Sequence, residues 1–244
     1  MDIQQKNLCG SAPLREHSSG AGYSLILDRS SPLPSLAVFK DGGAVLSHVW
    51  QGEPSRAPGW LAEARDVLAA AQIPLAAVTS FVCGVGPGSF SGIRACLAAV
   101  NGLAMPEARP VYGVASAAAI ALAQAAERVT VAGDARRNRI WCVTYQVDAA
   151  AGRVRLADGR VPSHTADDFQ LVAADELPKA VPEGTRIVSP DWERLAPALR
   201  AAFGEARLLA QPVFPSAEAI GRLACAEPSA RRLEPSPIYL HPAV

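Results

Sequence analysis

Metal-binding and disulfide patterns are missing from this sequence. Its five cysteines are odd in number and scattered, and no C-x-x-C pair occurs among them. The four histidines form no H-E-x-x-H or H-x-x-x-H pair, which would place two imidazoles on one helix face. We therefore expect buried thiols in a reducing compartment, and neither a disulfide framework nor a zinc site.

An excess of charge and long apolar runs are absent as well. Lys+Arg and Asp+Glu number 23 each, which disfavours nucleic-acid binding by this chain alone, except at a local basic patch. No apolar run approaches the roughly 18–20 residues of a membrane span, and residues 1–20 lack the apolar centre of a signal peptide. We expect a cytoplasmic protein that does not bind membranes, with residues 1–21 as a disordered extension.

Apolar residues make up half of the 244 positions, enough for one large domain or two of about 100–120 residues each. Period-two patterns at 23–27 and 35–49 predict a meander of strands, with a hairpin turn at 41–43. From Trp60 onward the apolar residues recur at helical spacing, which predicts a helix that begins there. Further helices are predicted at 91–104, 116–127, 163–175, 192–204 and 216–226.

One pattern occurs twice, about a hundred residues apart. Asp28 follows the strand at 23–27, and Asp134 follows a strand that begins at Arg128; a polar turn and a second strand come after each aspartate. One interpretation is a duplicated α+β lobe. The other is a pair of unrelated hairpins, because aspartate is common in turns. These residues alone favour neither.

The stretch "GVGPGSFSGIR" at residues 84–94 invites three chemical interpretations, and each fails. A phosphate-binding P-loop needs a lysine after its last glycine, and none follows Gly88 or Gly92. The dinucleotide spacing G-x-G-x-x-G is not met. A nucleophile elbow needs a serine where Phe90 stands. A mechanical function remains: Gly88 allows positive φ, and Ser89 or Ser91 caps a helix.

Five stretches together resemble one family: "LILDRS", "GVGPGSFSGIRACLAAVNGLA", "VYGVAS", "GDARRNRIWCVTY" and the closing "PIYL". They stand in the order found in the TsaB family, the dimerisation subunits of the bacterial tRNA threonylcarbamoyladenosine complex. The glycine loop and the helix after it are the most specific of the five. The resemblance spans residues 23–240.

This resemblance implies an α/β chain with the two-lobed actin, Hsp70 and sugar-kinase (ASKHA) fold, built from duplicated RNase H-like α+β lobes. The first lobe is expected at 22–113 and the second at 114–212. A C-terminal helix and tail at 213–244 are expected to pack back on the first lobe. Asp28 and Asp134 then become equivalent positions beside an interlobe cleft.

The resemblance also implies a non-catalytic subunit, with no catalytic residue and no metal. Its partner would be a TsaD-type transferase paralogue that modifies adenosine 37 of tRNA, with a TsaE-type ATPase in the complex. The chain alone would form a homodimer, hold no cofactor and meet tRNA only through the complex, where ATP or ADP binds at the subunit junction. The expected partner-interface residues are Trp60, Leu61, Ala64, Leu68, Ser91, Gly92, Ala95, Cys96 and Ala99. A relic nucleotide or anion cleft is expected at Asp28, Gly86, Gly88, Ser89, Asp134 and Arg136.

Three positions depart from the family pattern. Arg29 replaces a threonine after the first aspartate, Arg56 stands where a histidine usually precedes the first interface helix, and His241 replaces an arginine near the end. Two other functions therefore stay open. One is an ATP-dependent enzyme of the same superfamily that uses Asp28 and Asp134, and the other is a glycoprotease-like peptidase, for which no nucleophile and base are found.

Overall fold

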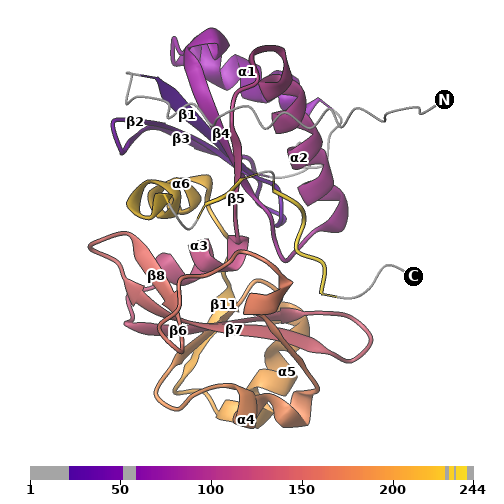
Figure 1. Cartoon of the computed structure of the whole chain (residues 1–244). Helices are drawn as coiled ribbons and strands as arrows, with labels where there is room; N and C mark the ends of the chain where they lie inside the picture. The colour runs from indigo at the N-terminus through magenta and orange to yellow at the C-terminus, as the bar shows by residue number, and fades with distance from the viewer. Residues whose placement is uncertain (1–21, 52–58, 229–230, 234, 241–244) are drawn as a thin grey trace, which may run out of the picture.

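The computed structural model describes residues 22–51, 59–228, 231–233 and 235–240, and these form two lobes stacked on one another (Figure 1). The first lobe contains a six-stranded sheet in the order β12-β5-β4-β1-β2-β3. Its strands are β1 (Tyr23–Asp28), β2 (Ser35–Lys40), β3 (Gly43–Val49), β4 (Val78–Gly84), β5 (Val111–Val114) and β12 (Arg232–Leu233). The predicted hairpin turn is confirmed, with Asp41 at φ 51° and Gly42 at φ 80° between β2 and β3.

The second lobe repeats this topology. Its sheet runs β11-β10-β6-β7-β8, and β9 pairs with β7. The strands are β6 (Arg128–Asp134), β7 (Ile140–Asp148), β8 (Arg153–Leu156), β9 (Gln170–Val172), β10 (Arg186–Ser189) and β11 (Leu208–Pro212). In both lobes the first three strands form an antiparallel meander. Strand β4 then pairs parallel with β1 and β5 with β4, just as β10 pairs parallel with β6 and β11 with β10. The duplicated two-lobed ASKHA fold is therefore confirmed, and Asp28 and Asp134 end equivalent strands.

Helices fill the layers around the two sheets (Figure 1). They are α1 (Trp60–Ala70), α2 (Phe90–Ala104), α3 (Ser116–Leu122), α4 (Leu177–Ala180), α5 (Trp192–Phe203) and α6 (Ala217–Ala226). Helices α1 and α2 lie outside the first sheet, and α5 covers the outer face of the second. Helices α3 and α6 pack against each other between the sheets, and every residue of α3 is buried.

The C-terminal helix α6 lies on the first sheet. The backbone N–H of Ala217 donates to Ser35 Oγ over 2.8 Å, and Gly221 lets the helix approach the ring of Phe39, where a Cβ would overlap the ring. Beyond α6, Ile238 N–H donates to the carbonyl of Val85. The end of the chain is thus tied to the first lobe and to the strand that leads into the glycine loop.

The prediction of a helix at 163–175 is wrong. This segment forms two short 3-10 turns around strand β9, and His164 has φ 54°. The Asp168 carboxylate accepts hydrogen bonds from the backbone N–H groups of Ser163 and His164, so local side-chain bonds replace the helical ones. Among the cysteines, Cys83, Cys96 and Cys142 are buried as expected, whereas Cys225 is exposed and Cys9 lies outside the described residues.

Candidate functional site

A cleft of about 1140 Å³ separates the lobes at the ends of β1 and β6. Its walls come from the turn after β1, the glycine loop and the first turns of α2, the turn after β6, and the start of α5. Residues 238–240 form a further part of the rim. Four arginines and two aspartates line it: Arg29, Arg94, Arg136, Arg194, Asp134 and Asp191.

Asp28 is fully buried and does not line the cleft. Its carboxyl group accepts hydrogen bonds from the Ser30 N–H and hydroxyl and, over 2.7 Å, from the hydroxyl of Ser116. A Cβ on Gly84 would overlap this carboxyl group, so glycine is needed there. Burial raises the pKa of Asp28, and the bonds from Ser116 and Ser30 oppose that shift. Asp28 therefore holds the strand end together and cannot reach a ligand in the cleft.

The glycine loop is a tight turn that seats α2. Gly86, with φ +93°, takes the left-handed conformation that was predicted for Gly88, so that prediction is wrong. Gly88 is needed for space, because a Cβ there would overlap the carbonyl oxygen of Ser30. The predicted cap is confirmed, since Ser89 Oγ accepts from the N–H of Gly92 over 3.2 Å.

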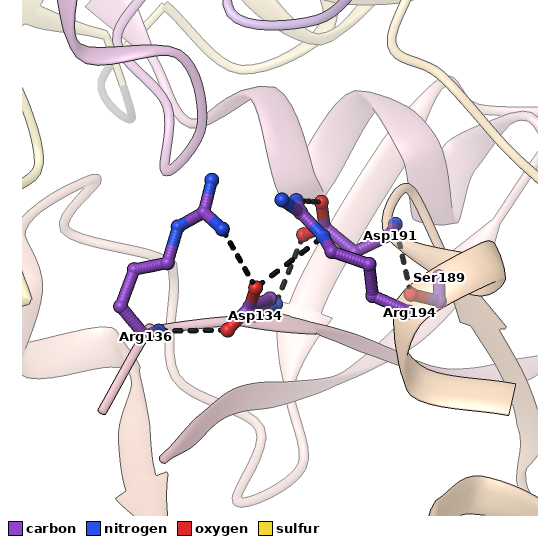
Figure 2. A network of polar contacts seen from close by, with 5 residues as sticks. All are labelled: Asp134, Arg136, Ser189, Asp191 and Arg194. Atoms are coloured by element: carbon purple, nitrogen blue, oxygen red, sulfur yellow. Dashed lines mark hydrogen bonds and ion pairs between the residues drawn. The ribbon is translucent and has the colours of Figure 1, made fainter. Parts of the chain in front are cut away.

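Asp134 is held by an ion-pair network at the end of β6 (Figure 2). Its carboxylate lies 3.3 Å from the guanidinium groups of both Arg136 and Arg194, and accepts from the Arg136 N–H over 2.7 Å. Asp191 accepts from the Asp134 N–H and pairs with Arg194, while its own N–H donates to Ser189 Oγ. The Asp134 carboxylate thus already has two cationic partners.

The acidic groups around the cleft are already engaged by other residues. Within the described part of the chain, no three His, Cys, Asp or Glu side chains come together as a metal-binding cluster. One aspartate of the equivalent pair is buried and the other is ion-paired. The lining of the cleft holds four arginines against two aspartates, and this positive balance suits an anion better than a cation.

Arg29, the departure after Asp28, has a structural function. Its guanidinium stacks on the ring of Trp60 with 4.4 Å between the guanidinium carbon and the ring centroid, and the residue is 8% exposed. Burial lowers the pKa of this guanidinium. The residue thereby ties the end of β1 to the first turn of α1. Arg56 and His241, the other two departures, lie outside the described residues.

A second depression, of about 770 Å³, lies between α1 and α2 above the first sheet. Its lining is almost entirely apolar: Leu25, Leu27, Leu61, Ala62, Ala64, Arg65, Leu68, Ala69, Gln72, Ile73, Pro74, Leu75 and Leu103. Leu61 and Leu75 are 38% and 37% exposed. We call this surface the α1–α2 groove. An apolar groove between two helices on a protein's outer face is typical of a protein-binding surface.

Of the predicted interface residues, Leu61, Ala64 and Leu68 line the α1–α2 groove, and the others lie outside it. Leu61 and Ser91 are exposed, and Ala95 and Ala99 are half-buried. Cys96 is fully buried, with its thiol 3.1 Å from that of Cys83, so it belongs to the core and cannot meet a partner. A Cβ on Gly92 would overlap the Arg29 carbonyl, so Gly92 faces its own lobe. In α1, Trp60 is buried outside the groove, whereas Ala64 and Leu68 are buried at its floor.

Several residues that shape the cleft escaped the sequence analysis. Ser116 follows β5 by two residues, and Ser189 and Asp191 stand at the end of β10 and just beyond it. The signal that could have found them is their position, because polar residues just after parallel strands gather at one edge of a sheet. Arg194 lies one turn into α5 and carried no such signal.

Comparison with known proteins decides the family. The model of the family described as TsaD, tRNA N6-adenosine threonylcarbamoyltransferase, matches residues 61–161. YeaZ from Pseudomonas aeruginosa superposes with a TM-score of 0.68 at 30% identity, covering 85% of this chain and 94% of that one. The chain belongs to the TsaB (YeaZ) family.

Two further relatives agree with this assignment. A Pseudomonas aeruginosa structure, of an uncharacterized protein with similarity to peptidase YeaZ, has a TM-score of 0.72 at 28% identity, covering 90% of this chain and all of that one. The tRNA threonylcarbamoyladenosine biosynthesis protein TsaB of Escherichia coli K12 is 29% identical over 128 residues, 51% of this chain. That match spans only 55% of the Escherichia coli protein. None of the described helices combines the length and apolarity that a bilayer crossing requires.

Proposed function

We propose that this chain is a non-catalytic subunit in the formation of N6-threonylcarbamoyladenosine at position 37 of tRNA. It binds a TsaD-type transferase and stabilises or activates it. The Escherichia coli relative is named for threonylcarbamoyladenosine biosynthesis, and the matched family model is that of the transferase itself. A chain that shares the transferase fold is suited to pair with it.

The α1–α2 groove is the observation that carries this proposal. Leu61 and Leu75 expose apolar surface at its mouth, and Met105, just past the end of α2, is 76% exposed. Covering such apolar surface stabilises a complex by roughly 25 cal/mol per Å² before the costs of association are subtracted. The partner presents a matching helix pair, and in the partner's absence a second copy of this chain covers the same surface.

The interlobe cleft supports a subunit without chemistry of its own. Asp28 is buried under Ser30 and Ser116, and Asp134 is neutralised by Arg136 and Arg194. Ser89 uses its side-chain oxygen to cap α2. The one of these carboxylates that lines the cleft, Asp134, is ion-paired, and Ser89 serves as a helix cap, which argues against the kinase-like and peptidase alternatives. ATP or ADP is then handled at the subunit junction and by a TsaE-type ATPase.

The test is threonylcarbamoylation of an ANN-reading tRNA by the cognate transferase and its other components, with and without this chain. We expect product only when the chain is present, and none from the chain alone. An Asp28→Asn variant should support the same rate, since this residue contacts no ligand. Modification that proceeds equally without the chain would refute the proposal. Tight binding of magnesium-ATP by the isolated chain, lost in Asp134→Asn, would favour the ATP-dependent enzyme instead.

A further inference from the structure

A third depression lies on the second lobe, at the end of the sheet opposite the interlobe cleft. Strand β6 reaches the cleft at Asp134, and its first residue, Arg128, lies in this depression of about 1380 Å³. The first residue of β10, Arg186, lines it too, together with the end of β7 and the start of β8. We call it the arginine groove. It shares no residue with the cleft or with the α1–α2 groove.

The arginine groove is locally basic in a chain whose formal net charge is zero. Five arginines and three acidic residues line it: Arg128, Arg153, Arg155, Arg186, Arg207, Glu127, Asp148 and Glu183. No lysine is among the lining residues. Arginine presents a planar fork of donors that matches a phosphate group with two parallel hydrogen bonds, so this composition suits phosphate better than an ammonium cluster would.

Backbone carbonyl groups orient two of these arginines without neutralising them. The Arg207 guanidinium donates to the carbonyls of Pro182 over 2.6 Å and Thr185 over 3.2 Å, and lies 5.1 Å from the ring centroid of Phe203. Arg153 Nε donates to the carbonyl of Ala226 over 3.1 Å. A carbonyl oxygen carries only a partial charge, so each guanidinium keeps its positive charge while losing conformational freedom in advance of binding.

Arg128 and Arg186 complete the positive surface. Strands β6 and β10 are parallel neighbours, and Arg186 pairs in register with Val129, the residue after Arg128. Both arginines are exposed, and neither forms an ion pair with another described residue. Of the five groove arginines only Arg155 has a carboxylate partner among the described residues, Glu227.

We propose that the arginine groove binds the phosphodiester backbone of RNA, so that this subunit contacts tRNA directly. The inference rests on the proposed function, which supplies tRNA as the RNA. No aromatic residue lines the groove. Aromatic side chains are enriched in protein–protein interfaces, and they stack on bases where a protein reads RNA sequence, so their absence from the lining disfavours both of these uses. The contact is therefore to the backbone and independent of sequence. It leaves the α1–α2 groove free for the transferase.

The test measures binding of a labelled tRNA transcript by fluorescence anisotropy at several salt concentrations, with the full chain alone and with its transferase. We expect Arg128→Glu/Arg186→Glu to weaken binding at least tenfold near 0.1 M salt. Losing about two phosphate contacts should also lower the slope of log K against log salt by about 1.5. The control, Arg160→Glu/Lys179→Glu, makes the same charge change at exposed residues of the second lobe outside the groove and should alter affinity less than threefold.

Three results would overturn the inference: equal losses in both double variants, no measurable RNA binding by the wild-type chain in either setting, or unchanged RNA affinity with lost transferase binding. The last would assign the groove to an acidic protein surface. Thermal unfolding of both variants checks that they fold. A further outcome separates the two proposals. If threonylcarbamoylation requires this chain but Arg128→Glu/Arg186→Glu changes neither the reaction nor the RNA affinity, the RNA contact is refuted and the proposed function stands. If RNA binding fails only in the groove variant while threonylcarbamoylation does not require this chain, the RNA contact stands and the proposed function is refuted.

Discussion

The hydroxyl of Ser116 donates a 2.7 Å hydrogen bond to the carboxyl group of Asp28, although 88 residues separate them in the chain. The same hydroxyl accepts from the N–H of Gly86 in the glycine loop. This one side chain therefore joins the end of β1, the glycine loop and the start of α3. Asp28 is therefore part of a closed polar cluster.

Removing the Ser116 hydroxyl should destabilise the protein. Ser116→Ala leaves a buried carboxyl group with one donor fewer and the Gly86 N–H without its acceptor, at an expected cost of about 1–3 kcal/mol in the free energy of unfolding. Urea denaturation measures this cost. Ser91→Ala, at an exposed serine on α2, is the control and should stay within roughly 0.5 kcal/mol of wild type. Equal effects at both positions would contradict the assigned function of the cluster.

Two glycines in the same region should respond in opposite directions to alanine. Gly88→Ala places a Cβ against the Ser30 carbonyl oxygen and should lower stability by about 1–3 kcal/mol. Gly102→Ala lies within α2, where a Cβ meets nothing within 4 Å, and should raise stability by up to about 1 kcal/mol through helix propensity. Thermal and urea unfolding both report the sign. Stabilisation by Gly88→Ala would refute the close approach of the loop to the turn after β1.

The α1–α2 groove predicts a selective effect on association. Leu61→Arg puts a charge into the apolar groove and should weaken binding of the TsaD-type partner at least tenfold, together with any self-association. Val45→Arg makes the same change at a 53% exposed residue of β3 outside the groove and should leave affinity unchanged. Calorimetry gives the affinity, and sedimentation gives the oligomeric state. A folded Leu61→Arg variant with wild-type affinity would place the interface elsewhere.

Acidification should lower the free energy of unfolding because His164 is buried in its neutral form. The Ala115 N–H donates to its Nδ1 over 3.1 Å, and burial lowers its pKa from 6.5 to about 4, a shift that Asp168 opposes. Because the folded state binds this proton less readily than the unfolded state, its contribution is complete above pH 6.5. Roughly 3 kcal/mol is then lost as the pH falls from 6.5 toward 4.

Two substitutions separate titration from hydrogen bonding at this position. His164→Asn keeps an acceptor near Nδ1, tolerates φ 54° and cannot titrate, so its stability should vary less between pH 6.5 and 4. His164→Ala loses the acceptor and should be weaker at every pH. Denaturant titrations across this range provide the measurement. An unaltered pH dependence in His164→Asn would show that another group is responsible.

Local patterns in the sequence determined much of the fold. Alternation and turn chemistry predicted the β2–β3 hairpin, the cap at Ser89 and the strand that ends at each aspartate. These features depend on neighbours a few residues away, so the chain needs no distant contact to specify them. The family motifs joined these elements into two equivalent lobes. The helix prediction for residues 163–175 was wrong because the Asp168 carboxylate accepts hydrogen bonds from nearby backbone N–H groups, and a helical pattern in the sequence does not reveal those bonds.

The state of each functional side chain was decided only by the tertiary structure. Asp28 and Asp134 look alike in sequence, yet Ser116 and Gly84 enclose the first while Arg194 pairs with the second. Cys96 lies at helical spacing from Ala99, but it faces the core. The arginine groove gathers five arginines from segments between positions 128 and 207. The burial and charge around a group depend on residues that folding brings together from distant parts of the chain, and no local pattern in the sequence records those contacts.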